Sequence, residues 1–169
     1  MNELAPRFAV VLDALGVEPG HRVLELGPGH GVLATALLDR VGQDGAVHLV
    51  DRSEKMLNAA VARNRRATDD GRLAVTIGRL QQVDLGDACF DRVVAVRVRE
   101  LWTDGDVALP RIRRWLVPGG RVAVGLDAPG GARPSTAVEA LVAALTDHGF
   151  VAVVASTVTD ASVVTATAP

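Results

Sequence analysis

A glutamate followed by three alternating glycines is the first pattern in the chain that could do chemistry. Glu25 stands near the end of an apolar run at residues 22–26, and Gly27, Gly29 and Gly31 come after it at alternate positions. Because glycine has no side chain, a ligand can approach the backbone N–H groups of such a loop closely. The same glycines could serve only a tight strand-to-helix turn; the ligand-binding interpretation is favoured.

The spacing of these glycines argues against two common phosphate-binding loops. Dinucleotide-binding folds use Gly-x-Gly-x-x-Gly, and the third glycine would fall where this chain has Val32. The P-loop requires Gly-Lys followed by Ser or Thr, and the single lysine of the chain, Lys55, lies far from the loop. A strand ending in Glu-x-Gly-x-Gly-x-Gly is the pattern that remains.

A second acid follows at a spacing that fits a nucleoside site. The apolar run at residues 46–50 ends in Asp51, twenty residues after Gly31, which leaves room for one helix and a turn. At the end of the second strand of a doubly wound sheet, a carboxylate can accept hydrogen bonds from both ribose hydroxyls. A helix-capping role for Asp51 is less favoured, because Ser53 is the better cap for the segment that follows.

Candidate catalytic residues follow the apolar run at residues 91–96, the expected fourth strand. Glu100 could act as a general base toward a hydroxyl acceptor, and Arg97 and Arg99 could clamp a carboxylate or phosphate. The alternative is that Glu100 merely pairs with one of these arginines, which we weigh above the base role. Trp102 fits a packing residue as well as a substrate wall.

These residues depend on strands and helices that alternate along the chain. Near-continuous Val/Leu runs separated by amphipathic segments predict an α/β fold with a Rossmann-like, doubly wound, mostly parallel seven-stranded sheet, a C-terminal antiparallel hairpin, and helices on both faces. At 169 residues the chain fits one domain. We divide it into an N-terminal helix (1–20), a cofactor-binding half (21–125) and a C-terminal helix and hairpin (126–169).

Several boundaries are predicted from local signals. The expected helices include residues 54–66, a short weak helix at 80–85, residues 106–116 with Pro110 in the first turn, and a helix capped by Ser135 that ends before Gly149. The apolar run at residues 91–96 is expected to continue as strand to Val98. The stretch Val117-Pro-Gly-Gly120 reads as a sharp stop before a strand at residues 121–125, and a tight turn at residues 159–161 would close the hairpin.

Together, four landmarks resemble class I S-adenosylmethionine (SAM)-dependent methyltransferases. They are the glycine loop with its glutamate, Asp51, the Phe-Asp pair at the start of the residue 91–96 run, and Leu-x-Pro-Gly-Gly at residues 116–120. They occur in the family's order, and the resemblance covers almost the whole chain. The sequence is similar to a small, core-only member of the small-molecule methyltransferases.

The resemblance implies roles for particular residues. The glycine loop would pack against the methionine part of SAM, with Glu25 orienting the loop or the ammonium group through water. The family often places an acid just after the third strand, here expected at residues 73–77, where the acid accepts from the adenine amino group. In this chain Arg79 and Leu80 stand at that position; the arginine could stack on the adenine face, and the Leu80 backbone could hydrogen-bond the base. The implied cofactor-binding residues are Glu25, Gly27, Gly29, Gly31, Asp51 (ribose), Arg52 and Met56 (flanking adenine), Arg79, Leu80 and Arg97 (through its carbonyl).

The implied activity is methyl transfer from SAM to an O, N or C centre of a small metabolite, with S-adenosylhomocysteine as product. Arg97 and Arg99, which follow the run at residues 91–96, favour an anionic metabolite. A SAM-binding protein without methyl transfer remains an alternative, because the adenine-side acid and the histidines seen near the tryptophan position of related enzymes are absent. An NAD-dependent oxidoreductase is the weakest alternative, because Val32 stands where a dinucleotide-binding loop has its third glycine.

Composition sets the expected partners. A net charge of −2 and 3% aromatic residues give no drive toward nucleic acid. One cysteine and no membrane-length apolar run predict a cytoplasmic protein without disulfides or membrane contact. Because only the first helix and residues 128–134 could cover an acceptor, we expect an open acceptor site, or one completed by a second subunit in a homodimer.

Overall fold

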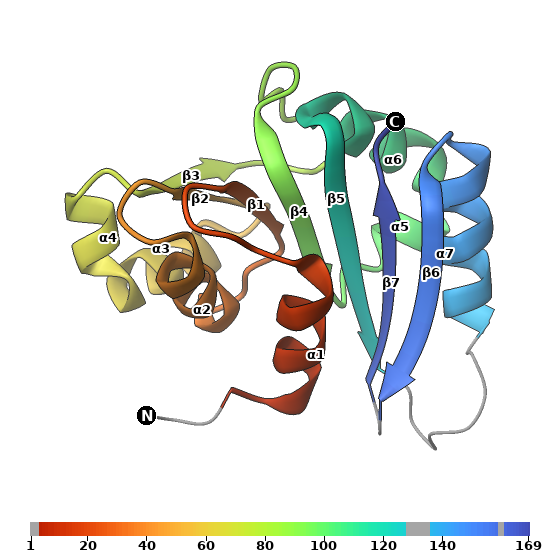
Figure 1. Ribbon diagram of the computed structural model, residues 1–169. Helices are drawn as coiled ribbons and strands as arrows, with labels where there is room; N and C mark the ends of the chain where they lie inside the picture. The colour runs from red at the N-terminus through yellow and green to blue at the C-terminus, as the bar shows by residue number, and fades with distance from the viewer. Residues whose placement is uncertain (1–3, 128–135, 159–160) are drawn as a thin grey trace.

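The computed structural model describes residues 4–127, 136–158 and 161–169. Helices and strands alternate along the chain as the sequence predicts (Figure 1). In chain order they are α1 (Pro6–Leu15), β1 (Arg22–Leu26), α2 (Val32–Val41), β2 (Ala46–Asp51), α3 (Glu54–Arg63), α4 (Arg65–Asp69), β3 (Leu73–Ile77), β4 (Phe90–Val96), α5 (Glu100–Thr103), α6 (Gly105–Trp115), β5 (Leu116–Asp127), α7 (Thr136–Asp147), β6 (Val151–Val158) and β7 (Ala161–Thr167).

One seven-stranded sheet in the order β3-β2-β1-β4-β5-β7-β6 forms the centre of the molecule. The first five strands are parallel, and β7 runs antiparallel to both β5 and β6. This confirms the predicted fold class. The strand order reverses between β1 and β4, and ligands of open α/β sheets bind at such a switch point, beyond the carboxyl ends of the strands.

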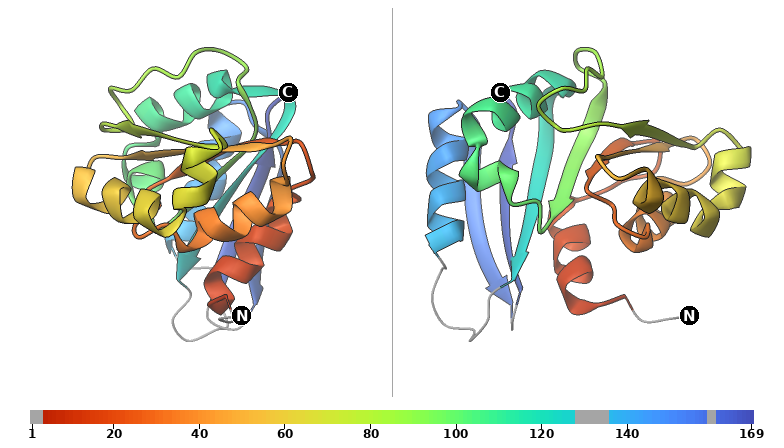
Figure 2. Two further views of the ribbon diagram at one scale, coloured as in Figure 1. Left: turned by 90° about the vertical axis from the view of Figure 1, so that its left-hand side faces the viewer. Right: turned by 180° about the vertical axis from the view of Figure 1, so that it is seen from behind.

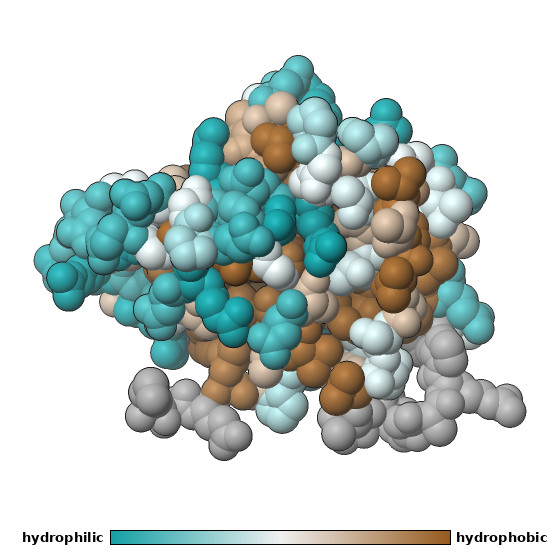
Figure 3. All heavy atoms as spheres, viewed as in Figure 1, coloured by the Kyte–Doolittle hydropathy of each residue, from teal (hydrophilic) through white to brown (hydrophobic). Residues whose placement is uncertain are grey.

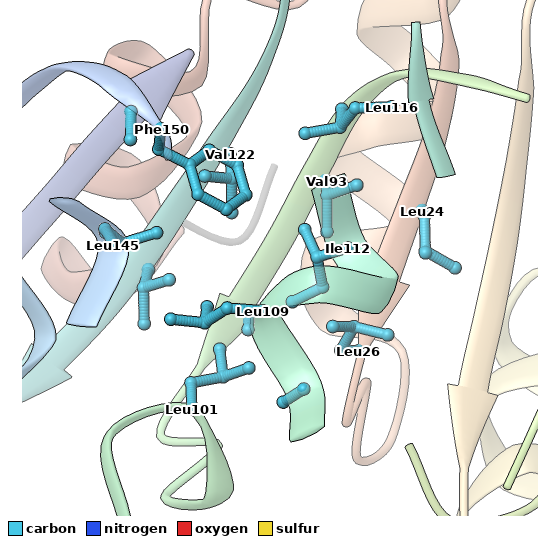
Figure 4. Packing of buried hydrophobic residues seen from close by; sticks show 14 of the residues in the cluster. Leu24, Leu26, Val93, Leu101, Leu109, Ile112, Leu116, Val122, Leu145 and Phe150 are labelled. Carbon is cyan, nitrogen blue, oxygen red and sulfur yellow. The ribbon is translucent and has the colours of Figure 1, made fainter. Parts of the chain in front are cut away.

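Helices cover both faces of the sheet. Helices α1, α2 and α3 lie on one face, and α5, α6 and α7 cover the other around β4 to β6 (Figures 1 and 2). Each face has its own buried cluster of apolar side chains. On the α5–α7 face, side chains from β1, β4, β5 and the helices converge (Figure 4), among them Leu24, Val93, Leu109, Ile112 and Phe150.

The helix predicted at residues 54–66 is two helices, because α3 ends at Asn64 and α4 follows it. The backbone φ of Asn64 is −110°, and its side-chain amide donates to the carbonyl oxygens of Gly31 (3.2 Å) and Ala60 (2.9 Å). Asparagine side chains compete with the helical backbone for such hydrogen bonds, which favours a break.

The short helix predicted at residues 80–85 is wrong. Only one turn forms, in which the N–H groups of Gln82 and Val83 both donate to the carbonyl of Arg79. The chain then turns away because Gly86 has a φ of +81° and its N–H donates to the side chain of Asp84.

Two further differences lie around α6. Pro110 is in the second turn of the helix rather than the first, where its ring removes one backbone hydrogen bond. Strand β5 already begins at Leu116 and runs through the predicted stop, with Gly119 at φ +77° and the pairing with β4 shifted across it. Gly149, which follows α7, is left-handed as predicted, with a φ of +77°. The Ser135 cap, residues 128–134 and most of the turn at 159–161 lie outside the described residues.

None of the helices in the described ranges is both long and apolar enough to cross a membrane.

Candidate functional site

The loop at residues 27–31 (hereafter the glycine loop) connects β1 to α2 through three left-handed glycines. Their φ angles are +65° at Gly27, +55° at Gly29 and +74° at Gly31, a region that residues with a Cβ rarely adopt. The loop is tied to the sheet by a hydrogen bond of 2.9 Å from the N–H of Gly27 to the carbonyl of Val50 in β2. The backbone conformation alone therefore accounts for a glycine at each position.

The space around the three glycines differs, which separates their roles. A Cβ on Gly29 would meet no atom within 4 Å, whereas one on Gly27 would lie 2.9 Å from Cγ2 of Val98. A Cβ on Gly31 would lie 2.8 Å from Cα and Cβ of Ala60 in α3. Gly29 thus borders open space, while Gly31 allows α2 and α3 to pack closely.

Asn64 fixes this contact between the two helices. Besides its hydrogen bonds to the carbonyls of Gly31 and Ala60, its side-chain oxygen accepts from the hydroxyl of Thr35 at 2.8 Å. The asparagine is buried, with 7% of its surface exposed. Its network holds the start of α2, and with it the glycine loop, against α3. Nothing in the sequence pattern pointed to Asn64, because two of its partners, Gly31 and Thr35, lie about thirty residues earlier in the chain.

Asp51 ends β2 beside the glycine loop. Its Oδ1 accepts a hydrogen bond of 2.9 Å from the N–H of Ser53, and the Ser53 hydroxyl oxygen accepts from the N–H of Met56 at 3.4 Å. Ser53 is therefore the cap of α3, as predicted. The turn orients the Asp51 carboxylate and leaves Oδ2 available to a ligand hydroxyl.

Glu25 is the buried acid of the site. Only 3% of its surface is exposed, and its Oε2 has no hydrogen-bond partner among the described residues. Burial raises the pKa of Glu25 from 4.5 to about 8, because the low-dielectric surroundings disfavour the charged carboxylate. A buried polar atom without a partner is uncommon in native structures and points to a missing ligand or water.

The end of β4 forms the opposite wall. Strand β4 stops at Val96, short of the predicted Val98, because Arg97 takes a left-handed conformation with φ +62°. Such a conformation is strained for a residue with a side chain and is found most often at functional sites. The turn leads directly into α5, a short helix that was not predicted, with Arg99 at its N-cap and Glu100 in its first turn.

Two adjoining cavities lie across these elements. The first, of about 240 Å³, is lined by Leu26, Gly27, Val50, Asp51, Arg52, Gly78, Arg79, Leu80, Gln81, Val96, Arg97, Val98 and Glu100. The second, of about 310 Å³, is lined by Arg7, Phe8, Glu25, Gly27, Pro28, Gly29, His30, Val32, Val96 and Arg97. Because Gly27, Val96 and Arg97 belong to both, the cavities are two parts of one cleft (hereafter the cleft) at the switch point of the sheet.

The cleft brings together most of the predicted site residues. In the first cavity are Gly27, Asp51, Arg52, Arg79, Leu80, Arg97 and Glu100, and in the second Glu25, Gly27, Gly29 and Arg97. Gly31, Met56 and Arg99 are not among the lining residues of either cavity. Trp102 is half-buried and packs against the core of the α5–α7 face, in keeping with a packing role.

The lining also includes residues that sequence reasoning missed. Arg7 and Phe8 come from α1, Gln81 from the turn after β3, and Val98 from the turn after β4. Gln81 directly follows Arg79 and Leu80, the residues at the position where the family resemblance would place an adenine-binding acid. An amide side chain can both donate to and accept from an adenine edge. Its position could have been suspected from the sequence; that of Arg7 could not.

The groups of the cleft match a nucleoside joined to an amino acid. Asp51 offers a carboxylate oxygen for a ribose diol, and the Oε2 of Glu25, which has no partner among the described residues, can accept from a donor such as an ammonium group. Between them, Gly29 leaves room for close approach to the backbone. The residues present therefore fit a cofactor of the kind that the sequence resemblance implies.

The fold and this cleft define an α/β domain for a nucleoside-containing cofactor, and comparison with known proteins gives the family. The model of the family described as "Methyltransferase domain" matches residues 23–120. The chain belongs to this family.

Among similar proteins, the ubiquinone/menaquinone biosynthesis C-methyltransferase UbiE of Cupriavidus necator is 38% identical over 125 residues, which are 73% of this chain and 49% of the relative. The chain thus spans about half the length of that relative. A SAM-dependent methyltransferase from Aquifex aeolicus has a similar fold, with a TM-score of 0.79 at 20% identity over 96% of this chain and 89% of that one. The Haemonchus contortus phosphoethanolamine N-methyltransferase 2 in complex with S-adenosyl-L-methionine gives a TM-score of 0.71 at 23% identity, covering 90% of this chain and 38% of that one.

Proposed function

We propose that this protein binds SAM in the cleft and transfers its methyl group to a small-molecule acceptor. The observation that carries the proposal is the pair of acids at the two ends of the cleft: Asp51 at the end of β2, and Glu25 with its unpartnered carboxyl oxygen. Asp51 binds the ribose and Glu25 the ammonium of the methionine moiety. Membership of the methyltransferase family and the SAM-bound neighbour support this assignment.

The remaining lining residues complete cofactor recognition. The adenine lies in the first cavity between Arg79 and Leu80, where a guanidinium can stack on its face. Gln81 takes the place of the adenine-binding acid of related enzymes and hydrogen-bonds the base edge. Arg52 flanks the base; Met56, which does not line either cavity, would need to move toward it.

In the transfer itself, bound SAM supplies a methyl group already activated on a sulfonium. The protein contributes alignment and exclusion of water. Glu100, at the start of α5 and in the lining of the first cavity, accepts the proton of a hydroxyl acceptor. Arg97, which lines both cavities, orients an anionic group of the acceptor.

Cofactor binding is tested by isothermal titration with SAM, S-adenosylhomocysteine and NAD. We expect both sulfur nucleosides to bind and NAD not to bind. Asp51→Ala should weaken S-adenosylhomocysteine binding at least tenfold, because it removes charge-assisted hydrogen bonds to the ribose. Asp39→Ala, an exposed aspartate on α2 outside the cleft, is the control and should bind normally. NAD binding in place of SAM would refute the proposal.

Methyl transfer is tested by mass spectrometry of reactions with a panel of metabolites, using matched acceptors that carry either a carboxylate or its amide. We expect S-adenosylhomocysteine to form with the carboxylate member of a pair, and Glu100→Gln to slow transfer to hydroxyl acceptors. Cofactor binding with no methylated product from any acceptor would favour a SAM-binding protein without methyl transfer.

We also propose that two copies associate through β6, the edge strand of the sheet. Strand β6 contains no charged residue, and Val151, Val154 and Val158 are 49%, 58% and 50% exposed. Hydrophobic side chains also gather on the surface over the right-hand part of the sheet, where β6 lies (Figures 1 and 3). Uncharged edge strands pair readily with one another. In antiparallel self-pairing about Ser156, Val154 of each copy would face Val158 of the other, and no like charges would oppose each other.

Light scattering after size exclusion tests this association. A dimer that Val154→Lys converts to a monomer supports it, whereas Val75→Lys on the opposite sheet edge, β3, should leave the dimer intact. A monomeric wild-type protein would refute it.

A further inference from the structure

A separate cavity of about 400 Å³ lies on β1, β2 and β3 (hereafter the sheet-face cavity). It shares no lining residue with either cavity of the cleft. His48, one of its lining residues, is in register with Leu24 of β1 and with Ala74 of β3, so the three side chains point to the same face of the sheet. Because Leu24 belongs to the buried cluster on the α5–α7 face, the sheet-face cavity lies on that face.

The sheet-face cavity is open because none of the described helices covers this part of the sheet. Helices α2, α3 and α4 contact β1 to β3 from the other face, whereas α5 to α7 lie beside β4 to β6 (Figures 1 and 2). The connection from β3 to β4, where a helix was predicted, makes one turn and then continues as irregular chain. That chain contributes Leu85 and Cys89 to the wall, and the strands contribute the small residues Ala46 and Ala74 to the floor.

Arg22, at the start of β1, gives the sheet-face cavity a positive charge. It forms no ion pair with any described residue. Its Cζ lies 5.9 Å from the centroid of the Phe90 ring, which also lines the cavity. Contact with an aromatic face attracts a guanidinium but leaves its charge in place. The cation therefore remains available to a ligand.

The other charged residues of the cavity have partners of opposite charge. An oxygen of Asp84 lies 3.7 Å from a guanidinium nitrogen of Arg114, and a guanidinium nitrogen of Arg72 lies 3.8 Å from an oxygen of Asp70. Arg22 is thus the charge that these pairs leave unbalanced, and a ligand with one negative charge would balance it.

His48 adds a polar group beside this charge. Burial and the positive charge of Arg22 lower the pKa of His48 from 6.5, so the imidazole is neutral at pH 7. Its Nε2 lies 2.8 Å from the hydroxyl oxygen of Thr76. When Nε2 accepts from that hydroxyl, Nδ1 carries the hydrogen, and Nδ1 has no partner among the described residues. The ring can therefore donate a hydrogen bond to an anion in the cavity.

The rest of the lining is suited to a flat apolar body. The rings of Phe90 and His48 meet edge to face, with their centroids 5.9 Å apart and their planes at 85°. Ala74 is exposed although it lies on a face of the central sheet. An aromatic ring placed over Ala74 would cover its methyl group and could contact the ring of Phe90, an arrangement that aromatic pairs favour.

We propose that the sheet-face cavity binds a small aromatic carboxylate. Arg22 and His48 hold the carboxylate, and the aromatic ring lies over Ala74 against Phe90. This second ligand site is separate from the cleft and does not depend on the function proposed above.

The test uses 2-naphthoate as the probe and 2-naphthamide as its uncharged counterpart. The chain has four histidines; in ¹³C-histidine-labelled protein, His48 reports on the sheet-face cavity and His30 on the cleft. The signal lost in His48→Gln identifies His48. By NMR titration, 2-naphthoate should shift this signal saturably, both with and without S-adenosylhomocysteine. No shift of the His48 signal, or a shift of His30 in its place, would overturn the proposal.

Two variants separate recognition of the charge from recognition of the ring. Arg22→Ala should weaken 2-naphthoate binding about tenfold, the lower range for a charge-assisted hydrogen bond because Arg22 is exposed, and change 2-naphthamide binding less than twofold. Ala74→Leu places a larger side chain in the floor and should weaken binding of both probes by about tenfold or more. Equal loss of both probes in Arg22→Ala, or unchanged affinities in Ala74→Leu, would overturn the proposed site.

Arg65→Ala and Val75→Leu are the matched controls. Arg65 is an exposed arginine on α4 that pairs with Asp69 at 3.7 Å. Val75 is on the opposite face of β3, in register with Leu49 of the other buried cluster. Neither change should alter the affinity for either probe, and a loss in these controls equal to that in Arg22→Ala and Ala74→Leu would overturn the site. A shift of the His48 signal in protein that fails to bind S-adenosylhomocysteine would refute the proposed function and leave this site supported.

Discussion

Replacing Glu25 with glutamine should remove a pH dependence from the stability of this protein. Glu25 is almost completely buried, and burial raises its pKa from 4.5 to about 8. The folded protein therefore holds this proton more tightly than the unfolded chain. The associated stability is fully present below pH 4.5, is lost as pH rises toward 8, and changes no further above it.

The size of the effect follows from the two pKa values. Each pH unit over which the folded protein keeps a proton that the unfolded chain has lost lowers the free energy of unfolding by about 1.4 kcal/mol. Between pH 4.5 and 8 the loss accumulates to about 5 kcal/mol at most. Glutamine is close to the neutral acid in shape and does not titrate, so Glu25→Gln should match wild type near pH 4.5 and exceed its stability increasingly up to pH 8.

Urea denaturation of both proteins at half-unit steps from pH 4.5 to 8.5 measures this difference, and other titrating groups cancel in it. Glu54→Gln is the control: Glu54 is exposed in the first turn of α3, so its replacement should shift stability by a constant amount, about 0.3–1 kcal/mol, across pH 5.5–8.5. Parallel pH profiles for wild type and Glu25→Gln would refute the argument, because Glu25 would then ionise in the folded protein as it does in water.

Three other changes have defined outcomes. Gly31→Ala forces a Cβ against the backbone of Ala60 at φ +74° and should lower the free energy of unfolding by about 3 kcal/mol in urea, whereas Gly29→Ala, with open space around it, should cost about 1–2 kcal/mol. Arg97→Gly should be more stable than Arg97→Ala by up to about 1 kcal/mol, since glycine tolerates φ +62°; equal melting temperatures would contradict this strain. Asn64→Ala should lose about 1–3 kcal/mol because it leaves buried hydrogen-bonding groups unpaired, and stability unchanged in denaturation would exclude that network as a support of the loop.

The sequence by itself determined the features that depend on neighbouring residues. The alternation of apolar runs and helical segments fixed the order of elements and the class of the sheet. Gly27 and Gly29 could be predicted as loop residues because a strand-to-helix loop of this kind needs left-handed backbone. Asp51 could be predicted as a site residue because it ends a strand. These three residues could be identified because each lies next to its strand in the chain.

Tertiary structure decided which residues meet across the cleft. Arg7 reaches the cleft because α1 packs on β4, β5 and β7, strands that lie far along the sequence, with Arg92 of β4 donating to the carbonyl oxygens of Leu15 and Gly16 at the end of the helix. Gly31 was read as part of the ligand loop, yet it borders Ala60 of another helix. Glu25 was visible as an acid beside the glycines, but burial, which removes its water and raises its pKa, is a property of the packed sheet. The periodicity of apolar residues and the spacing of motifs predict structure within a short stretch of chain. Desolvation of a side chain and contacts between distant segments arise only when the chain folds, so they could not be predicted from those patterns.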